Sequence, residues 1–372
     1  MQMYIINLLI VMLFSPLCRC QVRRLNGQLM EGKKAYGLIV CGTFSCLMAL
    51  RAPSVGVDTA LYARIYTLIA HQAGLMEAIR YAPLTGPAYV LLCRILSHLS
   101  RNPQLMIVVS SLLIDVGLMK LVNRVSADAP VSYLAWIGLT LFYCSMNGTR
   151  QVMALILSLH ALVRMSDSLR DAGAWMLFAV AVLTHPTALV LLFAMGGMLL
   201  ADRIDDDRLL LLISGAASLL IAFEYRIGVK LIVRFVPRYA MYTAEGAAYS
   251  IFNGTGGGRI VYLYLVLLGL VMLWLVPARA GTPSRRGFIE KMLPAVLFGA
   301  IFGIVNRRNE LINRLLWYYL GIDALFIPSV LARYEKLGRT VLTAAVVAVL
   351  LAYSMISLQE NHNGVVPYRF FW

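Results

Sequence analysis

Charged residues are scarce in this chain of 372 residues. Only 14% of its residues are charged and 60% are hydrophobic, whereas a soluble domain has about 25% charged and about 45–50% apolar residues. This shortage excludes an ordinary soluble globular protein. The composition predicts a protein that crosses a membrane several times.

Acidic residues are fewer than basic ones. The chain has 18 Asp and Glu against 33 Lys and Arg, which gives a net charge of +15. Basic cytoplasmic loops and attraction to anionic lipid headgroups account for such an excess in many membrane proteins. A polyanionic substrate such as a diphosphate accounts for it equally well, so the location of the charges has to decide.

Metal and nucleotide motifs are also missing. None of the six cysteines has a metal-ligand spacing with a histidine, so we interpret them as small apolar fillers. The acidic run "ADRIDDDR" (201–208) is flanked by arginines and is interpreted as a solvated loop. The segment "NGTGGGR" (253–259) lacks the Gly-Lys-Ser/Thr ending of a nucleotide P-loop. We therefore expect no metal, no cofactor and no nucleic-acid partner.

Long apolar runs predict an all-α, polytopic fold with about 12 transmembrane helices, forming one integral membrane domain over residues 1–372. Backbone groups in lipid must be hydrogen-bonded internally, so the spans should be helices. The first run has no basic residues before it, which indicates an uncleaved span. The predicted spans are 4–18, 35–51, 104–123, 131–146, 150–165, 173–184, 186–201, 209–224, 260–277, 288–305, 312–332 and 339–356.

Basic loops set the predicted orientation. The segments 19–34, 278–291 and 332–339 are rich in Lys and Arg, so the positive-inside rule places them in the cytoplasm. Two large outer-face loops follow, at 52–103 and 225–259. This topology assumes that the membrane is a bacterial inner membrane and that the active face is periplasmic.

The segment "GPAYVLLCRILSHLS" (86–100) is the ambiguous part of the first outer loop. Arg94 and His98 lie four residues apart on one face of an otherwise apolar helix. We interpret it as an interfacial or re-entrant amphipathic helix, and whether residues 84–100 span the membrane is left open.

Arginine dominates the basic residues of the predicted outer segments, where the positive-inside rule expects depletion. A guanidinium grips phosphate or carboxylate oxygens with a planar fork, which lysine cannot do. We therefore expect the outer face to need guanidinium groups for binding an anion. The residues are Arg51, Arg64, Arg80, Arg94, Arg101, Arg150, Arg226, Arg234, Arg238, Arg259, Arg307, Arg308, Arg314 and Arg369.

The motif "RAPSVGVDTALYARIY" (51–66) directly follows the second predicted span. Asp58 opens an amphipathic helix, so it either caps that helix or orients an arginine or a sugar hydroxyl, or acts as a general base. Arg51 begins the same motif and is a candidate ligand for the substrate.

The motif "NGTRQ" (147–151) predicts a helix start, with Asn147 or Thr149 as the cap. Arg150 then lies in the first turn, where the helix dipole disfavours a cation and favours a bound anion. Asn147, Arg150 and Gln151 are therefore candidates for binding phosphate, although snorkelling of Arg150 to headgroups is the alternative.

His185 precedes Pro186 at a predicted tight turn between two apolar helices. A lone histidine is most often structural, yet this one is the best-placed proton carrier among the five. Two later segments add candidates for diphosphate and sugar binding. These candidates are Arg234, Arg238, Tyr242, Gly257 and Arg314.

The order of these motifs along the chain resembles the EpsG-type, Wzy-like polysaccharide polymerases. The matching segments are "RAPSVGVDTALY", "NGTRQVMALILSLHAL", "AVLTHPTALVLL", "YAMYTAEGAAYSIFNGTGGG", "INRLLWYYLGIDALFIP" and the tail "VPYRF". The chain departs from the pattern at Thr149 and at Pro186, which puts the presentation of His185 in question.

The resemblance implies a GT-C-like helical bundle that joins oligosaccharide repeat units carried on undecaprenyl diphosphate, as in O-antigen biosynthesis. Its expected catalytic residues are Asp58, Arg150 and His185. A chain-length regulator and a flippase are the implied partners, besides membrane lipids. A flippase or transporter of a lipid-linked sugar is the alternative from another class, and an O-antigen-type ligase or a membrane acyltransferase is the alternative enzyme.

Overall fold

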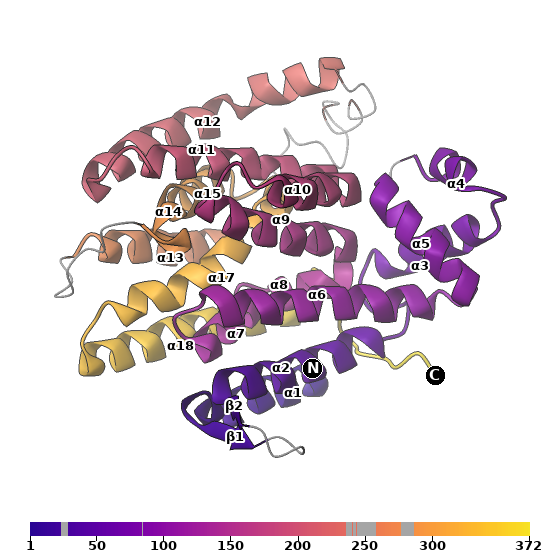
Figure 1. Cartoon of the computed structure of the whole chain (residues 1–372), viewed down its shortest axis with the longest axis horizontal. Helices are drawn as coiled ribbons and strands as arrows, with labels where there is room; N and C mark the ends of the chain where they lie inside the picture. The colour runs from indigo at the N-terminus through magenta and orange to yellow at the C-terminus, as the bar shows by residue number, and fades with distance from the viewer. Residues whose placement is uncertain (24–28, 84, 236–239, 241–242, 244–257, 277–285) are drawn as a thin grey trace. The chain divides into compact units, whose positions relative to one another are not determined.

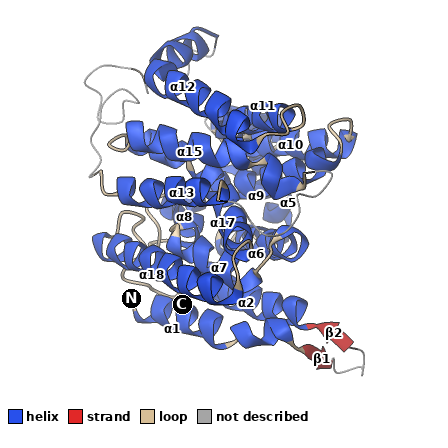
Figure 2. Ribbon diagram, turned by 90° about the vertical axis from the view of Figure 1, so that its left-hand side faces the viewer, coloured by secondary structure: helices blue, strands red, loops and turns tan. Residues whose placement is uncertain are grey.

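The computed structural model describes the chain except residues 24–28, 84, 236–239, 241–242, 244–257 and 277–285. Helices dominate it, as predicted (Figures 1 and 2). Contacts group the chain into two compact units. Unit 1 comprises Met1–Leu189 and Ile327–Trp372, and unit 2 comprises Val190–Phe326. The single membrane domain over residues 1–372 stays a prediction.

The described elements begin with α1 (Gln2–Leu13), the 3₁₀ helix η1 (Ser15–Arg19), β1 (Gln21–Arg23), β2 (Leu29–Glu31), α2 (Gly32–Ala49), α3 (Thr59–Ala70), α4 (Leu75–Tyr81), α5 (Pro87–Leu99), α6 (Gln104–Val125), α7 (Ala129–Gly138), α8 (Leu141–Asn147), α9 (Thr149–Asp167) and α10 (Ala172–Thr184). They continue with η2 (Pro186–Leu191), α11 (Leu192–Ala201), α12 (Asp207–Phe235), α13 (Ile260–Trp274), α14 (Phe288–Lys291), α15 (Leu293–Val305), α16 (Glu310–Leu315), α17 (Trp317–Ala332) and α18 (Lys336–Glu360).

Strands β1 and β2 form an antiparallel hairpin that the sequence analysis did not predict. Gln21 pairs with Glu31, and each strand has only three residues. The hairpin lies inside the predicted cytoplasmic loop 19–34, so it leaves the all-α class unchanged.

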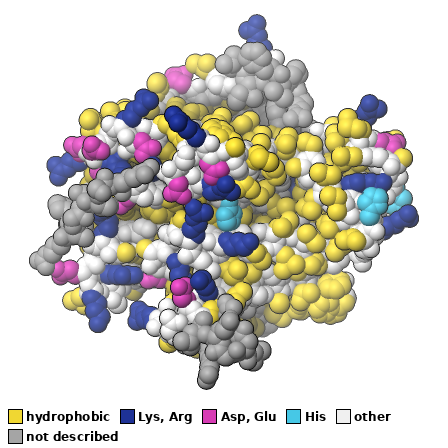
Figure 3. Space-filling model, in the orientation of Figure 1, with side chains coloured by type: hydrophobic (Ala, Val, Ile, Leu, Met, Phe, Trp, Pro, Cys, Tyr) yellow, Lys and Arg dark blue, Asp and Glu magenta, His cyan; other side chains and the backbone are white. Residues whose placement is uncertain are grey.

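Within the described part of the chain, four helices are long and apolar enough to cross a membrane, and a fifth span results if the bent pair α7 and α8 is counted as one. The four are Gln2–Arg19, Gln104–Val125, Asp207–Lys230 and Lys336–Glu360. Six shorter apolar helices lie among the described residues as well. Hydrophobic side chains cover much of the visible surface (Figure 3). The protein is thus an all-α membrane protein, and the count of about 12 spans stays a prediction.

The predicted span 131–146 is broken by a bend of 57° between α7 and α8. Thr140 has φ +63° at this point, in the left-handed region that β-branched residues rarely adopt. The break is held by tight packing of α7 against α18, because a Cβ at Gly138 would lie 2.6 Å from the Cβ of Leu350.

Charged groups gather at one end of the unit 1 helices. Arg339 pairs with Asp128 at 2.9 Å, and Arg164 pairs with Asp171 at 2.8 Å. Arg150 lies at the opposite end of α9. A helix of 19 residues is about 28 Å long, close to the thickness of a bilayer core. The two ends of α9 therefore suit the two surfaces of a membrane.

Unit 2 has a similar charged end. Lys291 is buried and pairs with Asp202 at 2.7 Å, while Arg286 pairs with Asp207 at 2.7 Å. The indole Nε1 of Trp274 also donates to Asp207 at 2.9 Å. Ion pairs within the chain therefore hold the acidic run 201–208 in place. The interpretation of this run as a solvated loop did not predict these ion pairs.

Candidate functional site

The junction between α8 and α9 is the centre of the candidate site. Gly148 is the residue that precedes α9, so the prediction that Asn147 or Thr149 caps this helix was wrong. The hydroxyl of Thr149 donates to the carbonyl oxygen of Ser145 at 2.9 Å, and the amide of Asn147 turns toward other elements. Both side chains are engaged in tertiary contacts instead of capping.

Arg150 lies in the first turn of α9, as predicted. Its guanidinium carbon is 4.9 Å from the ring centroid of Tyr62 on α3 and 5.8 Å from that of Tyr89 on α5. Cation–π attraction of about 0.5–2 kcal/mol offsets part of the repulsion between the cation and the helix dipole. The place remains one that favours an anion, because the N-terminal end of α9 and the guanidinium carry the same sign.

Asn147 joins this junction to Asp58. The amide is buried, its Oδ1 accepts the backbone N–H of Asp58 at 3.0 Å, and its Nδ2 donates to Oδ1 of Asn363 at 3.3 Å. Asp58 stands directly before α3, but its carboxylate makes no capping hydrogen bond with described residues. The roles of Asp58 as an orienting group or as a base stay predictions.

Arg51 lies behind the junction and is only 1% exposed. Its Nη2 donates to the carbonyl oxygen of Met146 at 3.3 Å and to the hydroxyl of Thr149 at 3.2 Å. A further guanidinium hydrogen bond goes to the carbonyl oxygen of Met48. These contacts tie the end of α2 to the start of α9, so Arg51 acts on the shape of the site from inside the protein.

The C-terminal tail closes the other side of the loop that carries Asp58. Four main-chain hydrogen bonds join them: Ala52 N–H to Arg369 O at 2.8 Å, Phe371 N–H to Leu50 O at 3.1 Å, Gly56 N–H to Gly364 O at 2.8 Å, and Val57 N–H to Asn363 O at 3.2 Å. The phenol of Tyr368 also donates to the carbonyl oxygen of Leu47 at 3.0 Å. Burial raises the pKa of Tyr368 to about 12, so this donor keeps its proton at neutral pH.

Gly56 is required where the loop crosses the end of α8. Its φ is +95°, and a Cβ there would lie 2.3 Å from the carbonyl oxygen of Met146. A side chain would push the loop away from α8. The glycine therefore allows Asp58 to reach Asn147.

His185 ends α10, and its Nδ1 lies 2.5 Å from the hydroxyl of Thr187. The start of α5 packs directly on this end of α10, because a Cβ at Gly86 would lie 2.3 Å from the carbonyl oxygen of Thr184. Tyr89 follows one turn later on α5. The end of α10 that precedes His185 thus contacts the same short stretch of α5 as the Arg150 stack.

Unit 1 brings together six of the predicted site residues, namely Arg51, Asp58, Asn147, Arg150, Gln151 and His185. Gln151 is buried in the first turn of α9. In unit 2, Arg234 lies exposed in the last turn of α12, and Arg314 lies with its guanidinium carbon 5.6 Å from the ring centroid of Trp317. Arg238, Tyr242 and Gly257 fall outside the described residues.

Sequence reasoning missed three contributors: Tyr62, Tyr89 and Asn363. Tyr62 lies inside the first motif and Asn363 lies just before the "VPYRF" tail, so both were near recognised segments. Their roles depend on contacts across the fold, which no spacing along the chain reveals.

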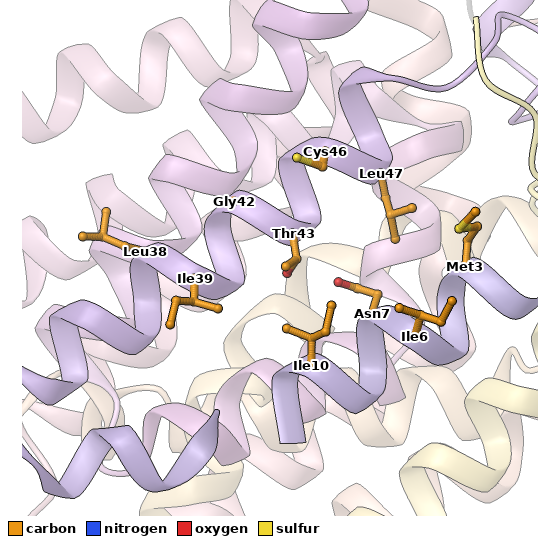
Figure 4. A pocket seen from close by; sticks show the side chains of 10 residues that line it. All are labelled: Met3, Ile6, Asn7, Ile10, Leu38, Ile39, Gly42, Thr43, Cys46 and Leu47. Carbon is orange, nitrogen blue, oxygen red and sulfur yellow. The ribbon is translucent and has the colours of Figure 1, made fainter. Parts of the chain in front are cut away.

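A cavity of about 340 Å³ opens between α1 and α2 and is mostly apolar (Figure 4). Asn7 and Thr43 are its amide and hydroxyl groups, and no charged side chain lines it among the described residues. It therefore offers nothing to a diphosphate. Among the residues that the structure describes, no group of three or more His, Cys, Asp or Glu could hold a metal ion.

Comparison with known proteins agrees with the order of the motifs. No curated protein and no solved structure matches the chain. The sequence does match the EpsG family over residues 34–370, a range that contains the α8–α9 junction and the tail as far as Phe370. Because this match covers nearly the whole chain, the protein belongs to the EpsG family.

Proposed function

We propose that this protein is a polysaccharide polymerase, which joins oligosaccharide repeat units carried on undecaprenyl diphosphate at the outer face of the bacterial inner membrane. Membership of the EpsG family supports a polymerase role in general. The observation that carries the specific proposal is the setting of Arg150. It lies at a helix N-terminus against the rings of Tyr62 and Tyr89, whose centroids are 6.4 Å apart, with Asp58 and His185 on neighbouring elements.

Arg150 and the N-terminal end of α9 bind the diphosphate in this proposal. Both present positive charge before the substrate arrives, so they stabilise developing negative charge without reorganising. Tyr62 and Tyr89 are buried and hold the guanidinium in place. The expected roles of Arg234, Arg238 and Arg314 in binding diphosphate, and of Tyr242 and Gly257 in binding sugar and phosphate, stay predictions from the sequence.

The reaction is a transfer of a glycosyl group. A hydroxyl of the acceptor sugar attacks the anomeric carbon of the donor, and the bond from that carbon to the diphosphate oxygen breaks. The electron pair leaves with undecaprenyl diphosphate, and the hydroxyl proton passes to Asp58 or His185. We expect inversion at the anomeric carbon, because the site has no second carboxylate placed as a nucleophile among the described residues.

Arg51, Asn147 and Gln151 position the reacting groups from inside the protein. Asn147 holds the backbone of Asp58, and Arg51 holds the start of α9. Their removal should change the rate through the geometry of the site.

Two other functions use similar groups. A carrier of lipid-linked sugar also needs arginines near the membrane, and a ligase would transfer the same glycan to a different acceptor. The stacked Arg150 at a helix N-terminus, with Asp58 and His185 on neighbouring elements, favours chemistry over transport. A flippase and a chain-length regulator remain the expected partners of the polymerase.

Arg150→Ala and Arg150→Lys test the proposal in cells that depend on this protein for their polysaccharide. Both variants should abolish long chains while their content in the membrane stays normal, since lysine cannot grip phosphate with a planar fork. Arg101→Ala is the control, because Arg101 is exposed in the link between α5 and α6 and is not one of the proposed site residues. Normal chain-length ladders from both Arg150 variants would refute the role of Arg150.

A further inference from the structure

Unit 2 contains a basic pocket that the sequence analysis did not single out. Arg226 from α12 and Arg307 and Arg308 after α15 line a cavity of about 340 Å³. Tyr225, Val305, Asn306 and Asn309 complete the lining. The side chains of three arginines therefore line one hollow, and Nη1 of Arg307 also donates to the carbonyl oxygen of Ile304 at 3.1 Å.

Hydrogen bonds fix the segment that carries two of these arginines. Nδ2 of Asn306 donates to the carbonyl oxygen of Ala222 on α12 at 3.2 Å, which holds the end of α15 against α12. Asn309 caps α16, because its Oδ1 accepts the N–H of Ile312 at 3.1 Å. The turn between these two anchors holds Arg307 and Arg308 at the mouth of the pocket.

The pocket lies a membrane's thickness from the charged end of unit 2. Arg226 follows Asp207 by 19 residues on the continuous helix α12, which corresponds to about 29 Å. Asp207 pairs with Arg286 at the other end. Since a bilayer core is about 30 Å thick, the pocket belongs at the opposite membrane surface, where a lipid presents its phosphate.

The chemistry of the pocket differs from that of the α8–α9 junction. Guanidinium groups grip phosphate oxygens bidentately. None of the described residues that line the pocket is an Asp, a Glu or a His. The pocket can therefore bind an anion, but it has no group to take a proton from an attacking hydroxyl.

We propose that this pocket binds the diphosphate of the acceptor substrate. The proposal rests on the proposed function, because a polymerase brings together two molecules that each carry a lipid diphosphate. One diphosphate leaves during transfer and needs the α8–α9 junction, which has a base nearby. The other stays attached to its sugar and only has to be held, which three arginines without a base can do.

Binding of farnesyl diphosphate, a short polyprenyl diphosphate, tests the proposal with the full chain in nanodiscs of neutral phosphatidylcholine. The wild type should bind two equivalents per chain. Arg307→Ala/Arg308→Ala and Arg150→Ala should each lose one equivalent, and their combination should lose both. The matched control Arg203→Ala/Arg208→Ala removes two exposed arginines elsewhere in unit 2 and should bind two. An unchanged two equivalents in Arg307→Ala/Arg308→Ala would overturn the proposal.

Two further experiments are needed. The first distinguishes a phospholipid headgroup from the acceptor diphosphate, and the second distinguishes failure of the pocket proposal from failure of the proposed function. Nanodiscs with anionic phosphatidylglycerol should leave the second equivalent in place, whereas its displacement would show that the pocket takes a phospholipid headgroup and would overturn the acceptor assignment. In a polymerisation assay, Arg307→Ala/Arg308→Ala should raise the KM for the acceptor by roughly 10-fold with little change in kcat. A third outcome is possible, in which Arg307→Ala/Arg308→Ala loses one equivalent of farnesyl diphosphate but the wild type makes no polymer. This result would contradict the proposed function and would still show that the pocket binds a diphosphate.

Discussion

Asn147 gives the sharpest test of how the site is held together, because its amide serves two partners at once. Asn147→Ala leaves the N–H of Asp58 and Oδ1 of Asn363 without their hydrogen bonds. A buried polar group that loses its partner costs about 1–3 kcal/mol. Both partners are only partly buried, so we expect a total of about 2 kcal/mol, which corresponds to roughly a 30-fold slower transfer.

The partner residue provides the matched comparison. Asn363→Ala removes one of the two side-chain hydrogen bonds and keeps the main-chain bond from Val57 to the carbonyl oxygen of residue 363. We expect a loss of about 1 kcal/mol, or roughly fivefold. The double variant should cost less than the sum by up to about 1 kcal/mol, because the bond between the two amides is counted in both single variants.

The assay is the initial rate of repeat-unit transfer by purified protein, normalised to folded protein in the membrane. Thermal unfolding in the same lipid separates lost stability from lost rate. Strictly additive effects of the two substitutions would show that the amides do not interact. A normal rate in Asn147→Ala would refute the conclusion that Asn147 positions Asp58.

Three further substitutions follow from single contacts. Gly56→Ala should reduce the transfer rate and lower the free energy of unfolding by about 1–3 kcal/mol, because its Cβ would lie 2.3 Å from a backbone carbonyl oxygen. Gly42→Ala is the control, because a Cβ there meets nothing within 4 Å. It should leave both the transfer rate and the melting temperature unchanged. Tyr62→Leu should slow transfer by roughly 2–30-fold, because it removes the cation–π contact with Arg150. Tyr62→Phe keeps the ring and should retain nearly the full rate. Equal rates in these two variants would show that the cation–π contact does not contribute. Hydrogen bonds from the guanidinium of Arg164 are the main cause that lowers the pKa of Asp171 below its ordinary value of 3.8. The ion pair therefore stabilises the folded protein fully above pH 3.8, and this stabilisation is lost as the pH falls through the lowered pKa. Asp171→Asn should therefore have a lower melting temperature than the wild type at pH 7, with the gap closing in strong acid, and a gap that is constant with pH would contradict this.

The centre of the site could be predicted because its residues sit in short motifs. Arg150 is unusual at a helix start whatever surrounds it, since the dipole disfavours a cation there. Asp58 is likewise conspicuous in an apolar chain. The same local reasoning assigned the cap of α9 to the wrong residue, because Asn147 satisfies a tertiary partner instead of the helix.

The surroundings of the site could not be read from the sequence. Asn363 bonds a residue 216 positions away, and the hydrogen bonds of the tail to residues 50–57 span more than 300 positions, so no periodicity carries them. Tyrosines are common at membrane surfaces, so no pattern in the sequence singles out the two that stack on Arg150. The bend at Thr140 was equally hidden, because threonine gives no signal for a left-handed backbone.

Reconstituted polymerisation tests the central claim most directly. Purified protein in liposomes receives an oligosaccharide on undecaprenyl diphosphate, with a chelator and without nucleotide. We predict products of several repeat units together with released undecaprenyl diphosphate, and no such products from Arg150→Ala. Unchanged substrate that has moved from one leaflet to the other would contradict the account and identify a carrier.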